Sequence, residues 1–223
     1  MHWCWAGICY GLEKCTKHFL KTINVIQSFK GMVPVIDATS YVHPMATVIG
    51  HVTIGANCFI GAGAVLRGDW GKIILDEGCN IQENVVVHMF PGTTVHLHAG
   101  AHIGHGAMIH GATIGKQCMV GMNAVVLDDV VLGDESIIGA LALVKAQSIW
   151  PKRSLIVGNP GKPIGSVSDE MIAHKREGTA LYQDLPLDMH QHSQEVLPLE
   201  MEPGNRKADF PVFETWQSRR KKG

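Results

Sequence analysis

Histidines are the side chains of this sequence that point most directly to chemistry. Eight of the thirteen lie between His43 and His110. His105 and His110 stand in the segment 103–111, whose other residues are small or aliphatic, and His88 precedes His105 by nearly three hexapeptides. Three neutral imidazoles around an open fourth position form the ligand set of a hydrolytic Zn²⁺ site. His88, His105 and His110 are therefore candidate metal ligands.

Polar side chains that would support such a site precede His88 in the sequence. Arg67 and Asp69 belong to an Arg-Gly-Asp tripeptide, and we interpret them as a charge pair, within one chain or across a subunit boundary. The alternative is a solvent-exposed pair worth less than about 1 kcal/mol. Gln82 and Glu83 lie about one hexapeptide before His88. Gln82 is a candidate for orienting a metal-bound water, and Glu83 for pairing with Arg67.

A six-residue period of aliphatic residues runs through the middle of the chain and indicates its fold. An amphipathic helix would repeat every three to four residues and a half-buried strand every two, and neither matches. Hexapeptide repeats are typical of β-helices, in which short strands coil and stack. We therefore predict an all-β fold, a left-handed parallel β-helix followed by a C-terminal α-helix. The aliphatic residues in register are Ile54, Ile60, Leu66, Leu75, Ile81, Val87, Ile103, Ile109, Ile114, Val120, Val126, Leu132, Ile138 and Val144.

Three hexapeptides, about 18 residues, make one turn of such a coil. His105 follows His88 by close to one turn, so the two are predicted to lie nearly stacked on one face. His110 lies around the next corner and is predicted to diverge from His105. The same ion then reaches both His105 and His110 only if a neighbouring subunit brings its own copy alongside.

Other histidines of the same region are not excluded as ligands. Spacing alone leaves His96, His98 and His102 as further candidates, whereas His43 and His51 resemble ordinary surface residues. The alternative for all of them is a structural role, because a lone histidine is usually hydrogen-bonded in the core or on the surface. The corners of a solenoid also accept many residue types.

The period slips at 67–72 and again at 88–102. Interruptions of a solenoid usually form loops on one face, often the binding face. Most of the candidate site residues lie at or beside these two slips. We therefore expect the site to lie where the regular coil is interrupted.

The chain divides into four segments. Residues 1–30 fall outside the period and are expected to form a poorly packed N-terminal extension. Residues 31–165 are predicted to form the β-helix, residues 166–196 a helical segment, and residues 197–223 an irregular tail. Pro186 is expected to end or kink the helix, because it lacks the amide hydrogen that a helix needs there.

The composition argues against several classes of function. The net charge of −1 gives no electrostatic reason to expect a nucleic-acid partner. No apolar run approaches the roughly 18 residues that span a bilayer, so no membrane partner is expected. Six cysteines are scattered through 223 residues, a chain too large to need a disulfide framework. We therefore expect reduced thiols and a cytoplasmic location.

The Arg-Gly-Asp tripeptide, the polar residues before His88 and the three candidate histidine ligands together resemble the gamma-class carbonic anhydrase family of hexapeptide-repeat proteins. They occur in the order typical of that family and near its spacing, and the resemblance covers about residues 31–165. Within the family, the chain is most similar to phenylacetate-degradation and carnitine-operon proteins. The motifs are Arg67-Gly-Asp69, Asn80-Ile-Gln82, His88 and Gly104-His105-Gly-Ala-Met-Ile-His110-Gly111.

The resemblance implies a homotrimer with metal sites at the subunit interfaces. His88 and His110 of one chain and His105 of its neighbour would hold Zn²⁺, with iron or cobalt as alternative metals. Gln82 would be the catalytic residue, because its family counterpart hydrogen-bonds the metal-bound hydroxide. The residues that would hold the interface are Arg67, Asp69 and Glu83.

Two differences from the family bear on the reaction. Efficient carbonic anhydrases of this class carry proton-relaying acids where this chain has Trp70 and the segment 89–92. Fast CO₂ hydration depends on exporting a proton, so we expect instead a hydrolase that splits a CoA thioester, as the phenylacetate-degradation likeness implies. The alternatives are CO₂ hydration and a non-catalytic trimeric accessory protein. The expected partner is a small-molecule substrate, either an acyl-CoA or CO₂ and bicarbonate.

Overall fold

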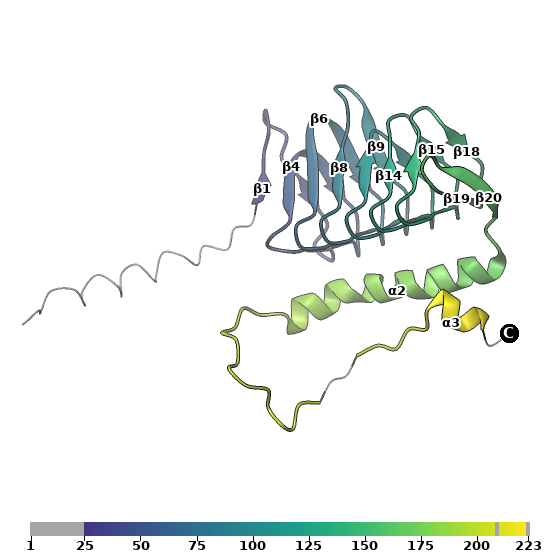
Figure 1. The fold of residues 1–223 in the computed structure, drawn as a ribbon. Helices are drawn as coiled ribbons and strands as arrows, with labels where there is room; N and C mark the ends of the chain where they lie inside the picture. The colour runs from purple at the N-terminus through teal and green to yellow at the C-terminus, as the bar shows by residue number, and fades with distance from the viewer. Residues whose placement is uncertain (1–24, 208–209, 222–223) are drawn as a thin grey trace, which may run out of the picture.

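The computed structural model describes residues 25–207 and 210–221. Its main body is a left-handed parallel β-helix whose turns stack along one axis, with one long helix beside it (Figure 1). Three flat sides, which we call faces 1, 2 and 3, enclose the core. Face 1 contains β3 (Tyr41–Val42), β5 (Phe59–Ile60), β7 (Asn80–Ile81), β10 (His102–Ile103), β13 (Met119–Val120), β16 (Ile137–Ile138), β19 (Ser154–Val157) and β20 (Lys162–Ser166).

Faces 2 and 3 share two long strands that bend from one face to the other, β4 (Thr47–Ile54) and β6 (Val65–Leu75). Face 2 also contains β1 (Val25–Gln27), β8 (Val86–His88), β11 (Met108–His110), β14 (Val125–Val126) and β17 (Leu143–Val144). Face 3 also contains β2 (Val35–Ile36), β9 (Thr94–Leu97), β12 (Thr113–Ile114), β15 (Val131–Leu132) and β18 (Ile149–Trp150).

The repeated aliphatic residues point into the coil and form one continuous core. Ile60 pairs in register with Ile81, and Val87 with Ile109, so that aliphatic side chains stack on aliphatic side chains in successive turns. All four side chains are fully buried. Burying one such side chain stabilises a fold by roughly 1.5–3 kcal/mol, so this stack is the main source of stability. The predicted fold class is confirmed.

Two turns of the coil are longer than the others, at the two places where the period slips. Val65 pairs with Val86, and Val86 with Met108, so each of these two steps exceeds three hexapeptides. The additional residues lie together between faces 2 and 3, where the amide of Gly92 donates to the carbonyl of Trp70 at 2.8 Å. We call this border, formed by residues 67–72 and 89–93, the loop edge.

Helix α2 (Asp169–His192) covers face 1 (Figure 1). It begins after Ser168, whose side chain accepts a hydrogen bond from the amide of Met171 at 3.2 Å. Of the two outcomes expected at Pro186, an end or a kink, the end does not occur, because the helix continues through the proline to His192. Packing on both sides of Pro186 explains this, because one helix ring contacts the coil before it and another after it. Those ring pairs are Tyr182–Phe59, 5.7 Å apart, and His190–Tyr41, 5.5 Å apart.

The ends of the described chain also have structure. Residues 25–27, which we placed in the N-terminal extension, form β1 and pair with β4. Residues 1–24 of that extension lie outside the described residues. The tail contains a short helix, α3 (Trp216–Arg220), tied to α2 by an ion pair of 2.6 Å between Arg219 and Glu177.

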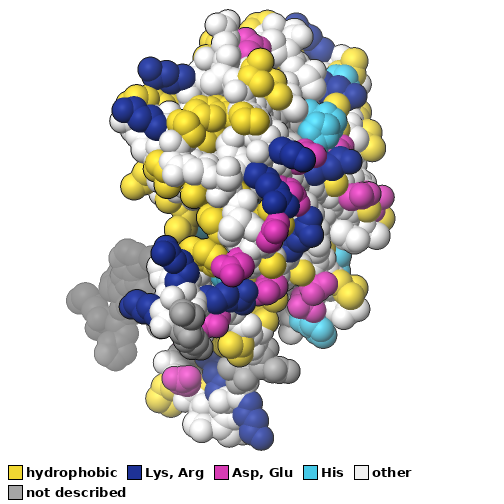
Figure 2. Space-filling model, turned by 90° about the vertical axis from the view of Figure 1, so that its right-hand side faces the viewer, with side chains coloured by type: hydrophobic (Ala, Val, Ile, Leu, Met, Phe, Trp, Pro, Cys, Tyr) yellow, Lys and Arg dark blue, Asp and Glu magenta, His cyan; other side chains and the backbone are white. Residues whose placement is uncertain are grey.

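The surface fits the near-neutral composition. Figure 2 shows basic and acidic side chains interspersed on the face in view, without a field of one sign. Within the described part of the chain, no helix is both long enough and apolar enough to cross a bilayer. Three cysteines, Cys58, Cys79 and Cys118, are buried as free thiols.

Candidate metal centre at the loop edge

His88 and His110 lie side by side on face 2. They are register partners at the ends of β8 and β11, and their ring centroids are 5.4 Å apart. The prediction that His88 stacks with His105 is therefore wrong. The loop after His88 lengthens this turn, so the step from His88 to His105 falls short of one full turn.

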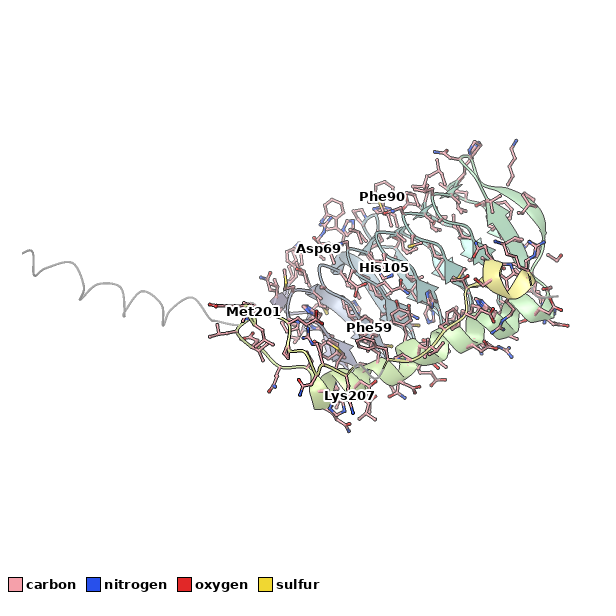
Figure 3. All side chains as sticks on the ribbon, turned by 60° about the horizontal axis from the view of Figure 1, so that its bottom comes forward. Phe59, Asp69, Phe90, His105, Met201 and Lys207 are labelled. Carbon is pink, nitrogen blue, oxygen red and sulfur yellow. The ribbon has the colours of Figure 1, made fainter. Side chains whose placement is uncertain are left out.

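His105 lies at the other edge of face 2. It occupies the corner before β11, whereas His110 is the last residue of that strand. Figure 3 shows His105 between Phe59, which lies near α2, and the border that carries Asp69 and Phe90. The two histidines of one chain thus leave the coil at different edges of face 2, as the corner geometry predicts.

A carboxylate contacts the Nδ1 atom of two of these histidines. Glu83 Oε2 lies 2.6 Å from His105 Nδ1, and Asp128 Oδ1 lies 2.6 Å from His110 Nδ1. A carboxylate at Nδ1 fixes the ring and leaves Nε2 available as a metal ligand, the usual arrangement of metal-binding histidines. Within one chain Glu83 thus pairs with His105 and not with Arg67, which corrects that prediction. Glu83 lies one turn of the coil before His105, and this position explains why it pairs with that histidine.

His88 is held by the predicted charge pair. Arg67 Nη1 lies 2.6 Å from Asp69 Oδ2, while His88 contacts Asp69 Oδ1 through Nε2 at 3.1 Å and Arg67 Nη2 through Nδ1 at 3.2 Å. Burial lowers the pKa of His88, so the ring is neutral at pH 7. Partial burial acts to raise the pKa of Asp69, but hydrogen bonds from Arg67 and His88 hold it below its usual value.

Two exposed aromatic rings flank the histidine pair. Trp70 is 51% exposed and its ring centroid lies 5.2 Å from that of His88. Phe90 is 56% exposed and lies 5.0 Å from His110. Exposed apolar side chains that gather in one place are typical of surfaces that bind a ligand or a partner protein. The loops of the coil therefore surround the two histidines with an apolar rim.

Gln82 is buried beside His105 and its amide orientation is constrained. Gln82 Oε1 accepts from the amide of His105 at 3.2 Å, and Nε2 lies 3.0 Å from Asn80 Oδ1 and 2.7 Å from His102 Nε2. His102 must therefore accept with a neutral ring. Desolvation beneath α2, aided by the charge of Lys175, lowers the pKa of His102 to about 3. A depression of about 340 Å³ opens here between Gln82, His102 and His105.

Two supporting residues were not identified from the sequence. Asp128 follows His110 by one regular turn of three hexapeptides, so that spacing could have indicated the contact. His102 was considered only as a metal ligand, and its role as a partner of Gln82 depends on the cover that α2 provides. Spacing within the repeat does not contain that information, because the helix follows only after the coil has ended.

The outward positions of face 2 form an apolar row between the two edges. The row pairs in register across successive turns of the coil, and each member is partly or largely exposed. Its members are Val65, Val86, Met108, Val125 and Leu143. A contiguous apolar surface of this kind is typical of a protein–protein contact.

The chemistry of the three histidines suits a metal ion. His105 and His110 offer Nε2 atoms, while His88 would exchange one of its two contacts for the ion. Neutral imidazoles with carboxylates behind them suit Zn²⁺ and its first-row neighbours. Across the described ranges, these three histidines of one chain do not converge on a single point.

A three-faced coil of hexapeptide turns defines the hexapeptide-repeat class, and comparisons with known proteins agree. The family model for the bacterial transferase hexapeptide (six repeats) matches residues 34–68 and 111–146. The chain belongs to the hexapeptide-repeat family. Over 179 residues it is 42% identical to the carnitine operon protein CaiE of Escherichia coli K12, a match that covers 80% of this chain and 91% of the relative.

Further relatives extend this family assignment. CaiE of Proteus sp. strain LE138 is 40% identical over 181 residues, covering 81% of this chain and 92% of the relative. A hexapeptide transferase family protein from Anaplasma phagocytophilum matches in structure with a TM-score of 0.71 and 33% identity, covering 74% of this chain and 97% of the other. A putative acetyltransferase from Bacillus cereus matches with a TM-score of 0.71 and 26% identity, covering 72% and 94%.

Proposed function

We propose that this protein is a trimeric metal-dependent hydrolase that splits an acyl thioester of CoA, with Zn²⁺ as the expected metal. The observation that carries the proposal is the pair His88 and His110 beneath the exposed rings of Trp70 and Phe90. Histidines supply the metal ligands, and the aromatic rim offers an apolar surface to an acyl chain. His105 of a neighbouring chain completes the ligand set.

The trimer is part of the proposal because one chain does not bring its three histidines together. In the proposed trimer, a neighbouring copy covers the apolar row of face 2. The edge of that copy that contains His105 then lies next to the loop edge of the first chain. That contact also removes Met108, 41% exposed, from water. Closed rings with head-to-tail contacts place the two different edges together in this way.

Each side chain of the site has a distinct task in the reaction. A metal ion bound there would act as a Lewis acid and lower the pKa of water. Glu83 and Asp128 orient His105 and His110 and increase their basicity as ligands. Gln82, whose Nε2 hydrogens are directed to Asn80 and His102, would orient the attacking water through the remaining lone pair of Oε1. A thioester needs little help in releasing its thiol, so the absence of an acid at position 70 is no obstacle.

Three observations keep other functions as candidates. The 42% identity to a carnitine operon protein supports an accessory role without catalysis, in the trimer proposed above. The same histidines support slow hydration of CO₂. The transferase names of the family model and of the structural relatives support acyl transfer from CoA. The cytoplasmic location expected from the reduced thiols suits each of these reactions.

Purified protein loaded with Zn²⁺ and supplied with a panel of acyl-CoA esters tests the proposal. We expect thioester hydrolysis that is lost in His110→Ala and kept in the control His43→Ala. Weak CO₂ hydration should rise in Trp70→Glu without a gain in thioester hydrolysis, because an acid there contributes general acid–base catalysis of up to about 10²–10⁴-fold. Fast CO₂ hydration by the unchanged protein, or no hydrolysis of any ester, would refute the thioesterase proposal.

A further inference from the structure

A second group of metal-ligating side chains lies on face 3, away from the loop-edge histidines. His96 Nε2 is 2.9 Å from Asp76 Oδ1, and His98 Nδ1 is 3.2 Å from Asp76 Oδ2. The two imidazole rings have centroids 3.9 Å apart and planes 37° apart. One ligand atom from each of the three residues lies within 4.8 Å of the other two.

The fold places these three side chains together for simple reasons. His96 lies in β9 and His98 directly follows its last residue, Leu97. Because side chains alternate along extended backbone, both rings point outward while Leu97 is buried. Leu75 is the register partner of Leu97, so Asp76 lies directly beside His98. The long turn that contains the loop after His88 sets this register. The cluster thus depends on the same insertion that forms the loop edge.

The cluster is accessible from solvent and partly buried. Side-chain exposures are 34% for Asp76, 28% for His96 and 32% for His98, so each donor atom is partly dry and still open to an ion. Helix α2 covers face 1, and the apolar row lies on face 2. Neither feature blocks the approach to face 3.

We propose that Asp76, His96 and His98 form a binding site for a divalent transition-metal ion, separate from the site of the proposed function. Two imidazoles and one carboxylate are the donors that Zn²⁺, Co²⁺, Ni²⁺ and Cu²⁺ prefer, and three protein ligands leave positions for water. When the ion binds, the proton of each ring moves from the nitrogen that faces Asp76 to the other ring nitrogen, so both imidazoles remain neutral ligands.

Such an ion would act as a clamp between two turns of the coil. Asp76 follows β6 in the first of the two long turns, and the two histidines belong to the second. These are the irregular turns that carry the loop edge. An ion that binds the folded state alone raises its stability in proportion to the logarithm of the free ion concentration. The site therefore stabilises the part of the coil that departs from the hexapeptide pattern.

Metal content measured on the full-length protein tests this site. Wild type, the double variant His96→Ala/His98→Ala and the control His51→Ala are loaded with Zn²⁺, dialysed and analysed for zinc per chain. We expect the double variant to contain one ion per chain fewer than wild type and His51→Ala to match wild type. The difference is informative even if the interface histidines bind no metal, so this test is independent of the proposed function.

A second variant covers the case in which the double variant does not fold. Asp76→Asn keeps the shape of the side chain but removes the negative donor, and Zn²⁺ titration should show binding at least about tenfold weaker at one site per chain. Zn²⁺ should also raise the melting temperature of Asp76→Asn by less than it raises that of wild type. Equal zinc content in wild type and the variants, or an unchanged titration in Asp76→Asn, would overturn the proposal.

Discussion

At the scale of single residues, the candidate site consists of histidines held by carboxylates. His110 and His105 each have an acid at Nδ1, while His88 lies between Asp69 and Arg67. These partners determine which nitrogen of each ring can bind an ion. The surrounding residues therefore matter to the metal almost as much as the ligands themselves.

Removing the charge behind His110 should weaken the metal site while leaving the fold intact. In Asp128→Asn the amide still fits beside Gly111, but it no longer provides the charged acceptor that fixes the ring of His110. Loss of such a partner typically costs about 10–100-fold in metal affinity. Competition with a chromophoric chelator measures this change in metal affinity. Asp129→Asn, an exposed neighbour with the same change of charge, is the control and should bind as wild type does.

His102 makes the stability of the protein depend on pH below neutrality. Its pKa in the folded state is about 3, lowered from 6.5. Between these values the unfolded chain binds a proton that the folded chain does not, so stability falls as pH decreases through this window. We expect the free energy of unfolding, measured with urea at pH 7 and pH 5, to fall by about 2 kcal/mol less in His102→Gln than in wild type. Equal losses in the two proteins would show that His102 titrates normally in the fold.

At the scale of elements, the corners and loops of the coil determine which side chains meet. The six-residue period predicted the inward positions, such as Ile81 and Ile109, because that pattern is local and repeats. The partner of His88 could not be predicted in the same way, since the length of the turn after it depends on how residues 89–93 pack against the strand that contains Trp70. Counting residues across an insertion does not reveal that packing.

Gly111 is a corner residue whose missing side chain makes room for the acid behind His110. It has φ +61°, and an added Cβ would lie 2.5 Å from Asp128 Oδ1. Gly111→Ala should therefore destabilise the protein by about 1–3 kcal/mol and also weaken metal binding, because Asp128 must move. Gly92→Ala is the matched control.

Gly92 has φ +81° but open space around its added Cβ. Gly92→Ala should therefore lower stability by a similar amount and change metal affinity little. Thermal unfolding and chelator competition on both variants separate backbone strain from the displacement of Asp128. Equal metal affinity in the two variants would argue against an orienting role for this acid.

At the scale of the whole molecule, one chain is a coil with three different faces. Helix α2 covers face 1, an apolar row lies along face 2, and the Asp76–His96–His98 cluster lies on face 3. The two parts of the candidate site lie on opposite edges of face 2. A hydrolytic centre built from them therefore requires a second copy of the chain.

Mixed trimers of two inactive variants test most directly whether the centre is shared between chains. His105→Ala lacks the ligand of one edge and His110→Ala that of the other, so each protein alone should lack thioester hydrolysis. Trimers refolded from an equal mixture should recover about a quarter of wild-type activity, because one subunit contact in four then joins two intact edges. Mixed trimers as inactive as their parents, or full activity in either variant alone, would contradict a site shared between subunits.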